Sequence, residues 1–344
     1  IIEDNNIIDS TIHFFKFSCA AYGWKMLNPL MFANKRKAVL VHGFLTGDVM
    51  NNRALCEHTG IQEEDIVTTK WTSSDYHPAH YIAIDHSTLS IVIAIRGSFH
   101  VKDALVDLVA AATPFQGGYA HTGMLECARR KLDMIRLPLL QTIAQNPQYQ
   151  VVVIGHSLGA GTAALLTLLL KNELPCSVRL RCLAFAPPCV LSPNLAKGCE
   201  GLIDSFILGN DCVPRLSFAS IQKLKELTGK LMDQGSSGVS ILLKAKRGQI
   251  SIEDLKNEIH FQIDTALLPP GTCYHIAPET KDTAPAWLDK AYINKCFRME
   301  LSCPTLFSEV IVSSTMFSDH VPWNYQAAFE GLFKRQTLFN QQNN

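Results

Sequence analysis

Ser157, in a Gly-His-Ser-Leu-Gly turn, is the residue of this chain whose surroundings point most directly to chemistry. The turn follows the β-branched run 150–154 and precedes an apolar stretch, which favours a strand, a sharp turn and a helix with the serine Oγ exposed at the turn. Gly155 and Gly159 remove side chains that would collide with the neighbouring strand and helix. The sequence therefore predicts Ser157 as a nucleophile. We interpret His156 as structural, because adjacent residues at a tight turn project in different directions.

A serine hydroxyl is a weak nucleophile and needs a histidine base, which in turn needs a carboxylate to fix its tautomer. In hydrolases built on such a turn the order along the chain is serine, acid, histidine. Asp211 directly follows the apolar run 202–208, and a loop at the carboxyl end of a strand faces the site. Other acids lie within that strand (Asp204) or in later helices (Asp233, Asp254, Asp264). We therefore predict Asp211 as the acid.

Three histidines follow the acid. His320 lies in a loop just before a predicted terminal helix, 325–333, where a mobile base is expected. His275 stands in a short apolar stretch and fits a strand residue better, and His260 falls on a predicted surface helix. We predict His320 as the base and keep His275 as the alternative.

The oxyanion formed during acyl transfer needs two hydrogen-bond donors. The backbone N–H of Leu158, at the start of the helix, supplies one. The second could come from Ser98, which closes the buried run 91–95, or from the His-Gly turn at 41–44. Their order along the chain does not decide between the two.

Strand-like and helix-like segments alternate along the chain, as in a βαβ sheet. Short buried strands are expected at 37–41, 91–95, 150–154, 180–184 and 202–208, and helices at 124–142 and 160–170. Together with the turn at Ser157, this alternation predicts an α/β-hydrolase fold, with a mostly parallel central sheet flanked by helices.

Two parts of the chain depart from this alternation. Residues 1–54 form a predicted helical appendage, with an apolar helix at about 10–24 that packs either on the core or on a membrane. Residues 217–270 read as a helical insertion before the catalytic histidine, with helices at 221–232 and 252–261, and regulation is expected there. The hydrolase domain would then span residues 55–344.

Composition excludes several classes of protein. Basic and acidic residues number 31 each, so no long-range field favours nucleic acid or an anionic bilayer, and any membrane contact must be mainly apolar. No run of eighteen uninterrupted apolar residues is present. The eleven cysteines are scattered without CxxC pairs and no leader is recognisable, which favours a reduced, cytoplasmic setting.

Several segments in register between residues 57 and 332 resemble the class 3, fungal-type lipases, and most closely their sn-1-specific diacylglycerol lipase branch. Besides the turn at Ser157, the matching segments are 77–81 (HPAHY), 95–98 (IRGS), 102–108 (KDALVDL), 121–124 (HTGM), 186–188 (APP), 210–216 (NDCVPRL) and 319–322 (DHVP). Residues 18–24 (SCAAYGW) also resemble an element ahead of the catalytic domain in that branch.

The resemblance implies Ser157, Asp211 and His320 as a catalytic triad, with Ser98 and Leu158 as oxyanion donors. It also implies a lid at 99–110, and the residues expected to meet substrate there are Phe99, Leu105, Val106 and Val109. No metal or cofactor is required.

The expected activity is hydrolysis of glycerolipid esters, above all of diacylglycerol at sn-1, through an acyl-enzyme. A phospholipase A1 or a general carboxylesterase is the alternative among enzymes, and an inactive lipase-like lipid-binding scaffold is the alternative outside them. The expected partners are a lipid ester and the surface of a membrane or lipid droplet, with peripheral attachment and no nucleic acid.

Overall fold

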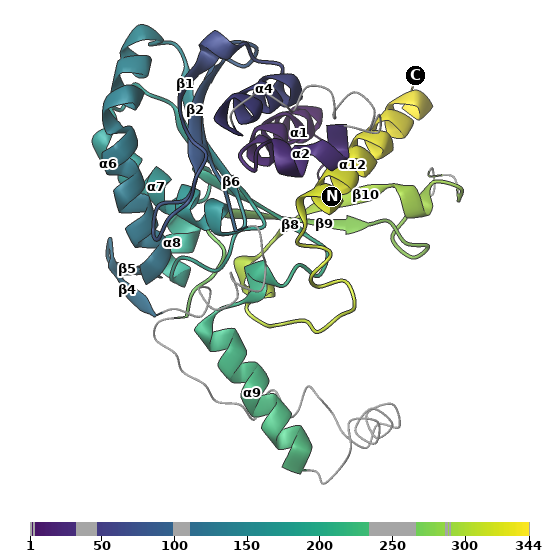
Figure 1. Ribbon diagram of the computed structural model, residues 1–344. Helices are drawn as coiled ribbons and strands as arrows, with labels where there is room; N and C mark the ends of the chain where they lie inside the picture. The colour runs from purple at the N-terminus through teal and green to yellow at the C-terminus, as the bar shows by residue number, and fades with distance from the viewer. Residues whose placement is uncertain are drawn as a thin grey trace.

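The computed structural model describes residues 2, 4–31, 47–98, 111–233, 266–285, 288 and 290–343. Its centre is an eight-stranded sheet in the order β1-β2-β3-β6-β7-β8-β9-β10 (Figure 1). The strands are β1 (Ile66–Lys70), β2 (His80–Asp85), β3 (Ser90–Ile95), β6 (Gln150–His156), β7 (Leu180–Phe185), β8 (Ile203–Leu208), β9 (Thr272–Pro278) and β10 (Phe297–Ser302). A separate hairpin pairs β4 (Ala112–Phe115) with β5 (Gly118–His121).

The five strands from β3 to β9 are parallel, while β1, β2 and β10 join antiparallel at the two edges. Every residue of β3 is buried, and so is β6 after its first residue, because both faces of the central strands are covered. Continuous β-branched runs suit strands in that position. The predicted mostly parallel sheet is confirmed, and the expected strand at 37–41 lies outside the described residues.

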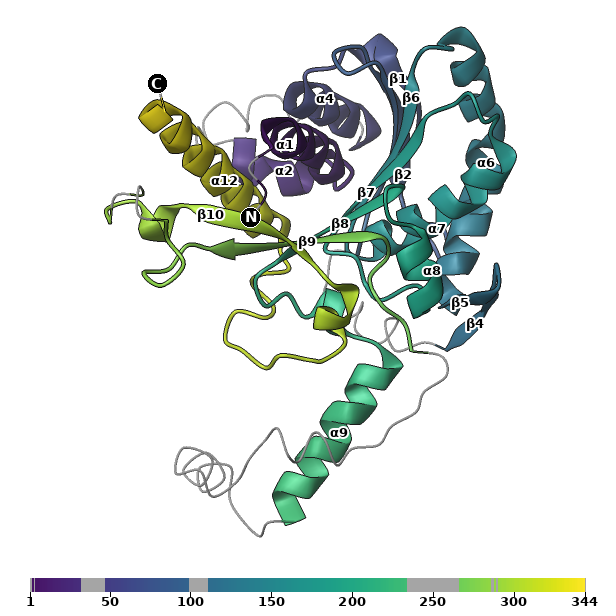
Figure 2. The same cartoon turned by 180° about the vertical axis from the view of Figure 1, so that it is seen from behind.

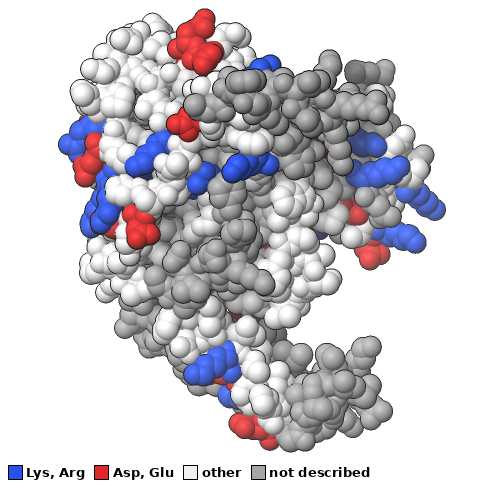
Figure 3. Space-filling model, viewed as in Figure 1, with Lys and Arg blue, Asp and Glu red and all other residues white. Residues whose placement is uncertain are grey.

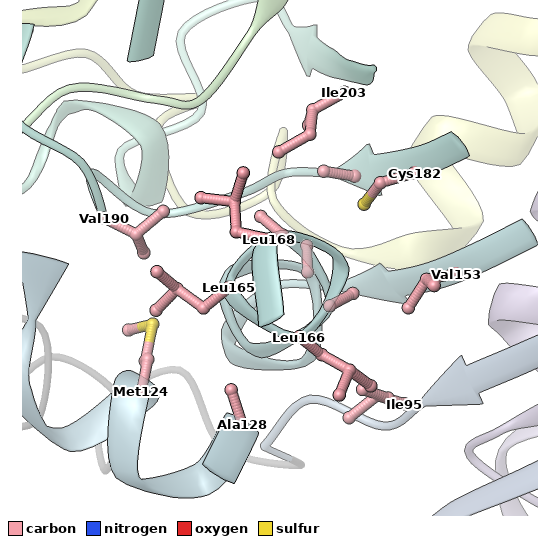
Figure 4. Packing of buried hydrophobic residues seen from close by; sticks show 14 of the residues in the cluster. Ile95, Met124, Ala128, Val153, Leu165, Leu166, Leu168, Cys182, Val190 and Ile203 are labelled. Atoms are coloured by element: carbon pink, nitrogen blue, oxygen red, sulfur yellow. The ribbon is translucent and has the colours of Figure 1, made fainter. Parts of the chain in front are cut away.

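Helices α6 (Thr122–Gln145), α7 (Leu158–Glu173) and α8 (Pro193–Gly198) cover one face of the sheet (Figure 1). Figure 4 shows the packing at the centre of this layer, where Leu165 and Leu166 of α7 lie among Met124 of α6, Val190 and Ile95. Alanine, glycine and leucine dominate α7, and eleven of its sixteen residues are buried. This packing fixes the start of α7, and with it the turn at Ser157.

The opposite face carries α1 (Asn5–Ala20), α2 (Trp24–Met31), α4 (Gly47–Thr59) and the terminal helix α12 (Pro322–Asn343) (Figure 2). Phe15 of α1 illustrates the contact, because its ring centroid lies 4.9 Å from those of both Phe185 on β7 and Phe329 on α12. Helix α1 is thus placed on the core, and α4 runs across the expected domain boundary at residue 54.

Helix α9 (Phe218–Asp233) projects away from the sheet and contains the first helix expected in the 217–270 insertion (Figures 1 and 2). The second, at 252–261, lies outside the described residues. Within the described ranges, no helix is both long and apolar enough to cross a membrane. On the face in Figure 3, acidic and basic side chains lie close to one another, in keeping with the zero net charge.

Short 3-10 turns complete the described structure. They are η1 (Glu63–Asp65), η2 (Val213–Arg215), η3 (Ile293–Lys295) and η4 (Pro304–Phe307). Turn η2 follows the predicted acid directly, and η4 opens the segment that leads to His320.

Candidate active site

Ser157 sits between β6 and α7 in a backbone conformation that L-residues rarely adopt, with φ 60° and ψ −132°. Its N–H donates to the carbonyl of Phe185 on the neighbouring strand, at 2.9 Å. A Cβ on Gly155 would lie 2.4 Å from the carbonyl group of Gly159, and one on Gly159 would lie 2.3 Å from the carbonyl oxygen of Ile95. The two glycines therefore allow strand, turn and helix to approach closely enough to present the serine.

Three residues far apart in the sequence form one hydrogen-bonded chain. The Oγ of Ser157 lies 2.8 Å from Nε2 of His320, and Nδ1 of His320 lies 2.9 and 3.0 Å from the two carboxylate oxygens of Asp211. A carboxylate only accepts, so Nδ1 carries the proton and Nε2 is left to accept from the serine hydroxyl. All three residues are buried. This is the geometry that activates a serine for attack on a carbonyl.

The carboxylate of Asp211 is held from two further directions. The N–H of Val213 donates to Oδ1 at 2.9 Å, and the hydroxyl of Tyr325 donates to Oδ2 at 2.9 Å. The tyrosine oxygen in turn accepts the N–H of Leu208, at 2.9 Å. Burial, reinforced by Asp211, raises the pKa of Tyr325 well above its ordinary value. The phenol therefore remains a hydrogen-bond donor to the carboxylate of Asp211.

The backbone beside His320 is tied to the same region. The carboxylate of Asp319 accepts the N–H of Asn210 at 2.8 Å, and the N–H of Cys212 donates to the carbonyl of Met316 at 3.1 Å. These bonds join the loop that carries the base to the loop that carries the acid.

The two predicted oxyanion donors come from two segments that adjoin the nucleophile, the start of α7 and the end of β3. Leu158 is the first residue of α7, and the first N–H groups of a helix have no acceptor within it. Gly97 adjoins the turn so closely that a Cβ there would lie 3.0 Å from Cβ of Ser157. Ser98 follows Gly97 directly, so its backbone N–H begins next to the nucleophile turn. Its role as an oxyanion donor stays a prediction.

Other predicted features fall elsewhere. The alternative donors at 41–44 and the expected lid residues Phe99, Leu105, Val106 and Val109 lie outside the described residues, as does His260. His275 is on β9, where its Nε2–H donates to the carbonyl of Gly209 at 2.9 Å. Asp204 faces Arg181 at 3.5 Å. Neither takes part in the hydrogen-bonded chain at Ser157.

Sequence reasoning missed three residues that support the site, which are Tyr325, Asp319 and Tyr22. Asp319 precedes the predicted base directly and belongs to the matching segment 319–322, but neither fact indicated its contact with Asn210. Tyr325 stands in the first turns of α12, where an isolated tyrosine reads as an ordinary core residue. Tyr22 belongs to the 18–24 element noted above, and nothing in that element indicated that its hydroxyl lies 2.9 Å from Nδ1 of His156.

Comparison with known proteins bears on this geometry. A family model described as Lipase (class 3) matches residues 92–221, from β3 to α9, and this range contains Ser98, Ser157 and Asp211. The chain carries a class 3 lipase domain. The predicted family is thereby confirmed, and His320 lies beyond the matched range.

Several curated lipases resemble parts of this chain. Mouse diacylglycerol lipase-beta is 32% identical over 239 residues, covering 63% of this chain and 35% of that protein. Human diacylglycerol lipase-alpha is 28% identical over 319 residues, covering 80% and 29%. A secreted mono- and diacylglycerol lipase A of Penicillium cyclopium is 36% identical over 148 residues, covering 42% and 48%. The chain thus spans about a third of the length of the first two relatives.

Two solved structures support the fold over nearly the whole chain. A mutant form of the Penicillium cyclopium enzyme MDLA aligns with a TM-score of 0.56 at 19% identity, covering 94% of this chain and 98% of that one. A triacylglycerol lipase whose catalytic centre is described as a serine protease triad aligns with a TM-score of 0.53 at 18% identity, covering 92% and 93%. The predicted α/β-hydrolase fold is confirmed.

Proposed function

We propose that this protein is a serine lipase that hydrolyses acyl ester bonds of glycerolipids, with diacylglycerol cleaved at sn-1 as its preferred substrate. The observation that carries the proposal is the unbroken chain from Ser157 Oγ through His320 to Asp211, with every link between 2.8 and 3.0 Å. A scaffold without turnover would have no need to keep all three groups aligned and buried.

The geometry supports acyl transfer in two halves. Ser157 Oγ attacks the ester carbonyl while Nε2 of His320 takes the hydroxyl proton, and the imidazolium is stabilised by Asp211. Collapse of the tetrahedral intermediate breaks the ester C–O bond, and the departing glyceride oxygen receives the proton from His320. Water then attacks the acyl-serine with His320 again as base, which releases the fatty acid and restores Ser157.

The choice of diacylglycerol comes from the relatives. The mouse and human proteins are named diacylglycerol lipases, and the Penicillium cyclopium protein a mono- and diacylglycerol lipase. All three names share action on acylglycerols, so we infer that the shared chemistry is hydrolysis of acylglycerol esters. The preference for the ester at sn-1 is a more specific part of the proposal, which the labelled substrates below test.

The first experiment compares wild-type protein with Ser157→Ala on diacylglycerol labelled in either the sn-1 or the sn-2 chain, on triacylglycerol and on phosphatidylcholine. Loss of a triad serine costs on the order of a millionfold in turnover. Ser177→Ala, the same change in an exposed turn, is the matched control and should keep full activity. Full activity of Ser157→Ala would refute the serine mechanism, and faster hydrolysis of phosphatidylcholine would favour a phospholipase A1.

A fluorophosphonate probe tests the remaining alternative. It phosphonylates an activated serine whatever the natural substrate, so the wild-type protein should be labelled at Ser157. Well-folded wild-type protein that stays unlabelled would favour the lipase-like scaffold over the enzyme.

We also propose that the segment before His320 touches the lipid surface. Within the fourteen residues that precede His320 in the chain, this segment exposes four large apolar side chains, which are Leu306, Ile311, Val312 and Phe317. Val312 is 74% exposed, and the segment is tied to the acid loop through the carbonyl of Met316. Apolar side chains grouped beside a lipase site can enter a lipid layer, which suits a chain without net charge.

Paired substrates separate this contact from catalysis. Val312→Asp should slow hydrolysis of diacylglycerol in phosphatidylcholine vesicles while leaving hydrolysis of a soluble short-chain ester unchanged. Leu137→Asp is the control, because Leu137 is similarly exposed, at 67%, but belongs to a different element. It lies about four turns from the start of α6, outside the segment that precedes His320. Equal losses in the two variants, or a loss on the soluble ester, would contradict a specific docking role.

A further inference from the structure

A buried hydrogen-bonded chain leads from the N-terminal segment to the backbone of the predicted base. The hydroxyl of Tyr22, just after α1, lies 2.9 Å from Nδ1 of His156, and Nε2 of His156 lies 2.9 Å from the carbonyl oxygen of His320. Tyr22 is 4% exposed, and both histidines are 2% exposed. His156 thus directs its ring away from the serine beside it in sequence and toward the loop of the catalytic histidine.

Chemistry fixes the direction of each bond in this chain. The carbonyl of His320 can only accept, so Nε2 of His156 must carry a proton. Burial, and then the neighbouring His320, lower the pKa of His156 well below its ordinary value, so its ring holds one proton and Nδ1 is an acceptor. Burial raises the pKa of Tyr22, so its hydroxyl remains the donor to Nδ1. No group in the chain can exchange roles near neutral pH.

The oxygen of Tyr22 has a second contact, with the strand end that precedes Ser98. The backbone of Gly97 approaches this oxygen closely, because a Cβ on Gly97 would lie only 2.6 Å from it. One phenol oxygen therefore lies between the loop of the base and the turn that leads to the predicted oxyanion donor.

We infer that Tyr22 and His156 are positioning residues of the active site. Through them the N-terminal segment holds the backbone of His320 and the Gly97–Ser98 turn in register with Ser157. The inference rests on the proposed function for the roles of His320 and Ser98. It assigns to Tyr22 an effect on turnover that acts through His156.

A small displacement of the base is enough to matter. Misplacing a reacting group by about 1 Å can cost on the order of a hundredfold in rate. His320 lies in the irregular segment between β10 and α12, so its backbone has no strand or helix to fix it. The bond from His156 supplies a fixed point, because His156 is the last residue of the central strand β6.

Tyr22→Phe is the direct test, because it removes one oxygen and leaves the ring. We expect kcat on a soluble ester to fall about tenfold with little change in KM, the effect of losing one buried hydrogen bond in the reacting geometry. The rate of Ser157 labelling by a fluorophosphonate should fall in parallel. His156→Gln, whose amide can donate to His320 and accept from Tyr22, should retain more activity than His156→Leu.

Tyr81→Phe is the matched control. Tyr81 is also fully buried, and its hydroxyl donates to the carbonyl of Phe17 on α1 at 2.6 Å, without contact to the triad. This variant should lose thermal stability at least as much as Tyr22→Phe but keep the wild-type kcat. Equal losses of kcat in the two variants would reduce Tyr22 to a structural residue and overturn the inference.

The labelling rate separates this inference from the proposed function, because it needs no lipid. Wild-type protein that is labelled but hydrolyses no glycerolipid would contradict the proposed substrate alone. A wild-type labelling rate in Tyr22→Phe, or no difference between the Gln and Leu variants of His156, would overturn the positioning role alone.

Discussion

Gly97→Ala is the perturbation whose effect can be worked most directly from the structure. The added methyl would lie 2.4 Å from the carbonyl oxygen of His156, 2.6 Å from the hydroxyl of Tyr22 and 3.0 Å from Cβ of Ser157. Ordinary contact begins near 3.4 Å, so the strand end and the nucleophile turn must separate by about 1 Å. The carbonyl is backbone and cannot rotate away.

That separation moves Ser98 relative to Ser157, and a shift of about 1 Å predicts a loss of around a hundredfold in kcat/KM. Loss of an oxyanion donor gives a similar range, ~10²–10³. The assay is hydrolysis of a soluble ester together with fluorophosphonate labelling and thermal unfolding. The losses should appear in the two activity measurements even at temperatures where the variant is fully folded.

The control is Gly229→Ala on α9, where a Cβ would meet nothing within 4 Å. The same chemical change there should leave activity unchanged and stabilise the helix by about 1 kcal/mol at most. If Gly97→Ala kept more than half of the wild-type kcat/KM, the close approach of Gly97 to the nucleophile would not be needed for catalysis. The placement of Ser98 as a donor would then lose its main support.

Three further predictions follow from single contacts. Tyr325→Phe removes a donor to the carboxylate of Asp211 and should lower kcat about tenfold or more, since hydrogen bonds to charged groups contribute about 1.5–3 kcal/mol; steady-state kinetics on a soluble ester would check this. Phe15→Ala should lower the free energy of unfolding by about 3–5 kcal/mol, measured by urea denaturation, because this ring packs between the sheet and α12. Burial lowers the pKa of Lys131 to about 7, whereas the unfolded chain keeps this proton to about pH 10, so the free energy of unfolding should rise with pH between these values. In Lys131→Met this rise should be smaller, by at most about 1.4 kcal/mol per pH unit. Equal slopes of unfolding free energy against pH in the two proteins would contradict the buried amine.

The nucleophile and its turn could be predicted from the sequence because their determinants are local. A sharp turn between a buried strand and an apolar helix requires Gly155 and Gly159 within a few residues of Ser157, and the structure gives the steric reason for both. The central strands were predictable for the same reason, because a strand buried on both faces must be apolar throughout.

Asp211 and His320 could be predicted less directly, because each depends on where a strand ends and not on a local pattern. His275 and His320 both follow the acid along the chain, and the sequence alone left His275 open as the alternative base. In the structure its ring, on β9, donates a hydrogen bond to the carbonyl of Gly209. The two residues are 66 positions apart, and no spacing rule predicts that pairing.

The antiparallel edges of the sheet were harder still. Strand β1 is partly buried along its whole length, and β10 alternates weakly, so neither shows a strong strand period. Edge strands take their register from the neighbour to which they bond, here β2 and β9, and that information is not carried in their own residues.

The N-terminal segment shows best why composition cannot settle a role. A helix that is apolar all round fits a protein core and a lipid layer equally well, so the sequence left both open for α1. In the structure Phe14, Phe15 and Phe17 are buried against the sheet and α12. The contact of Tyr22 with His156 spans 134 residues and could not be predicted from either neighbourhood. A chain that began at residue 55 would lack both this packing and this hydroxyl, so we expect it to be less stable and less active than the full chain.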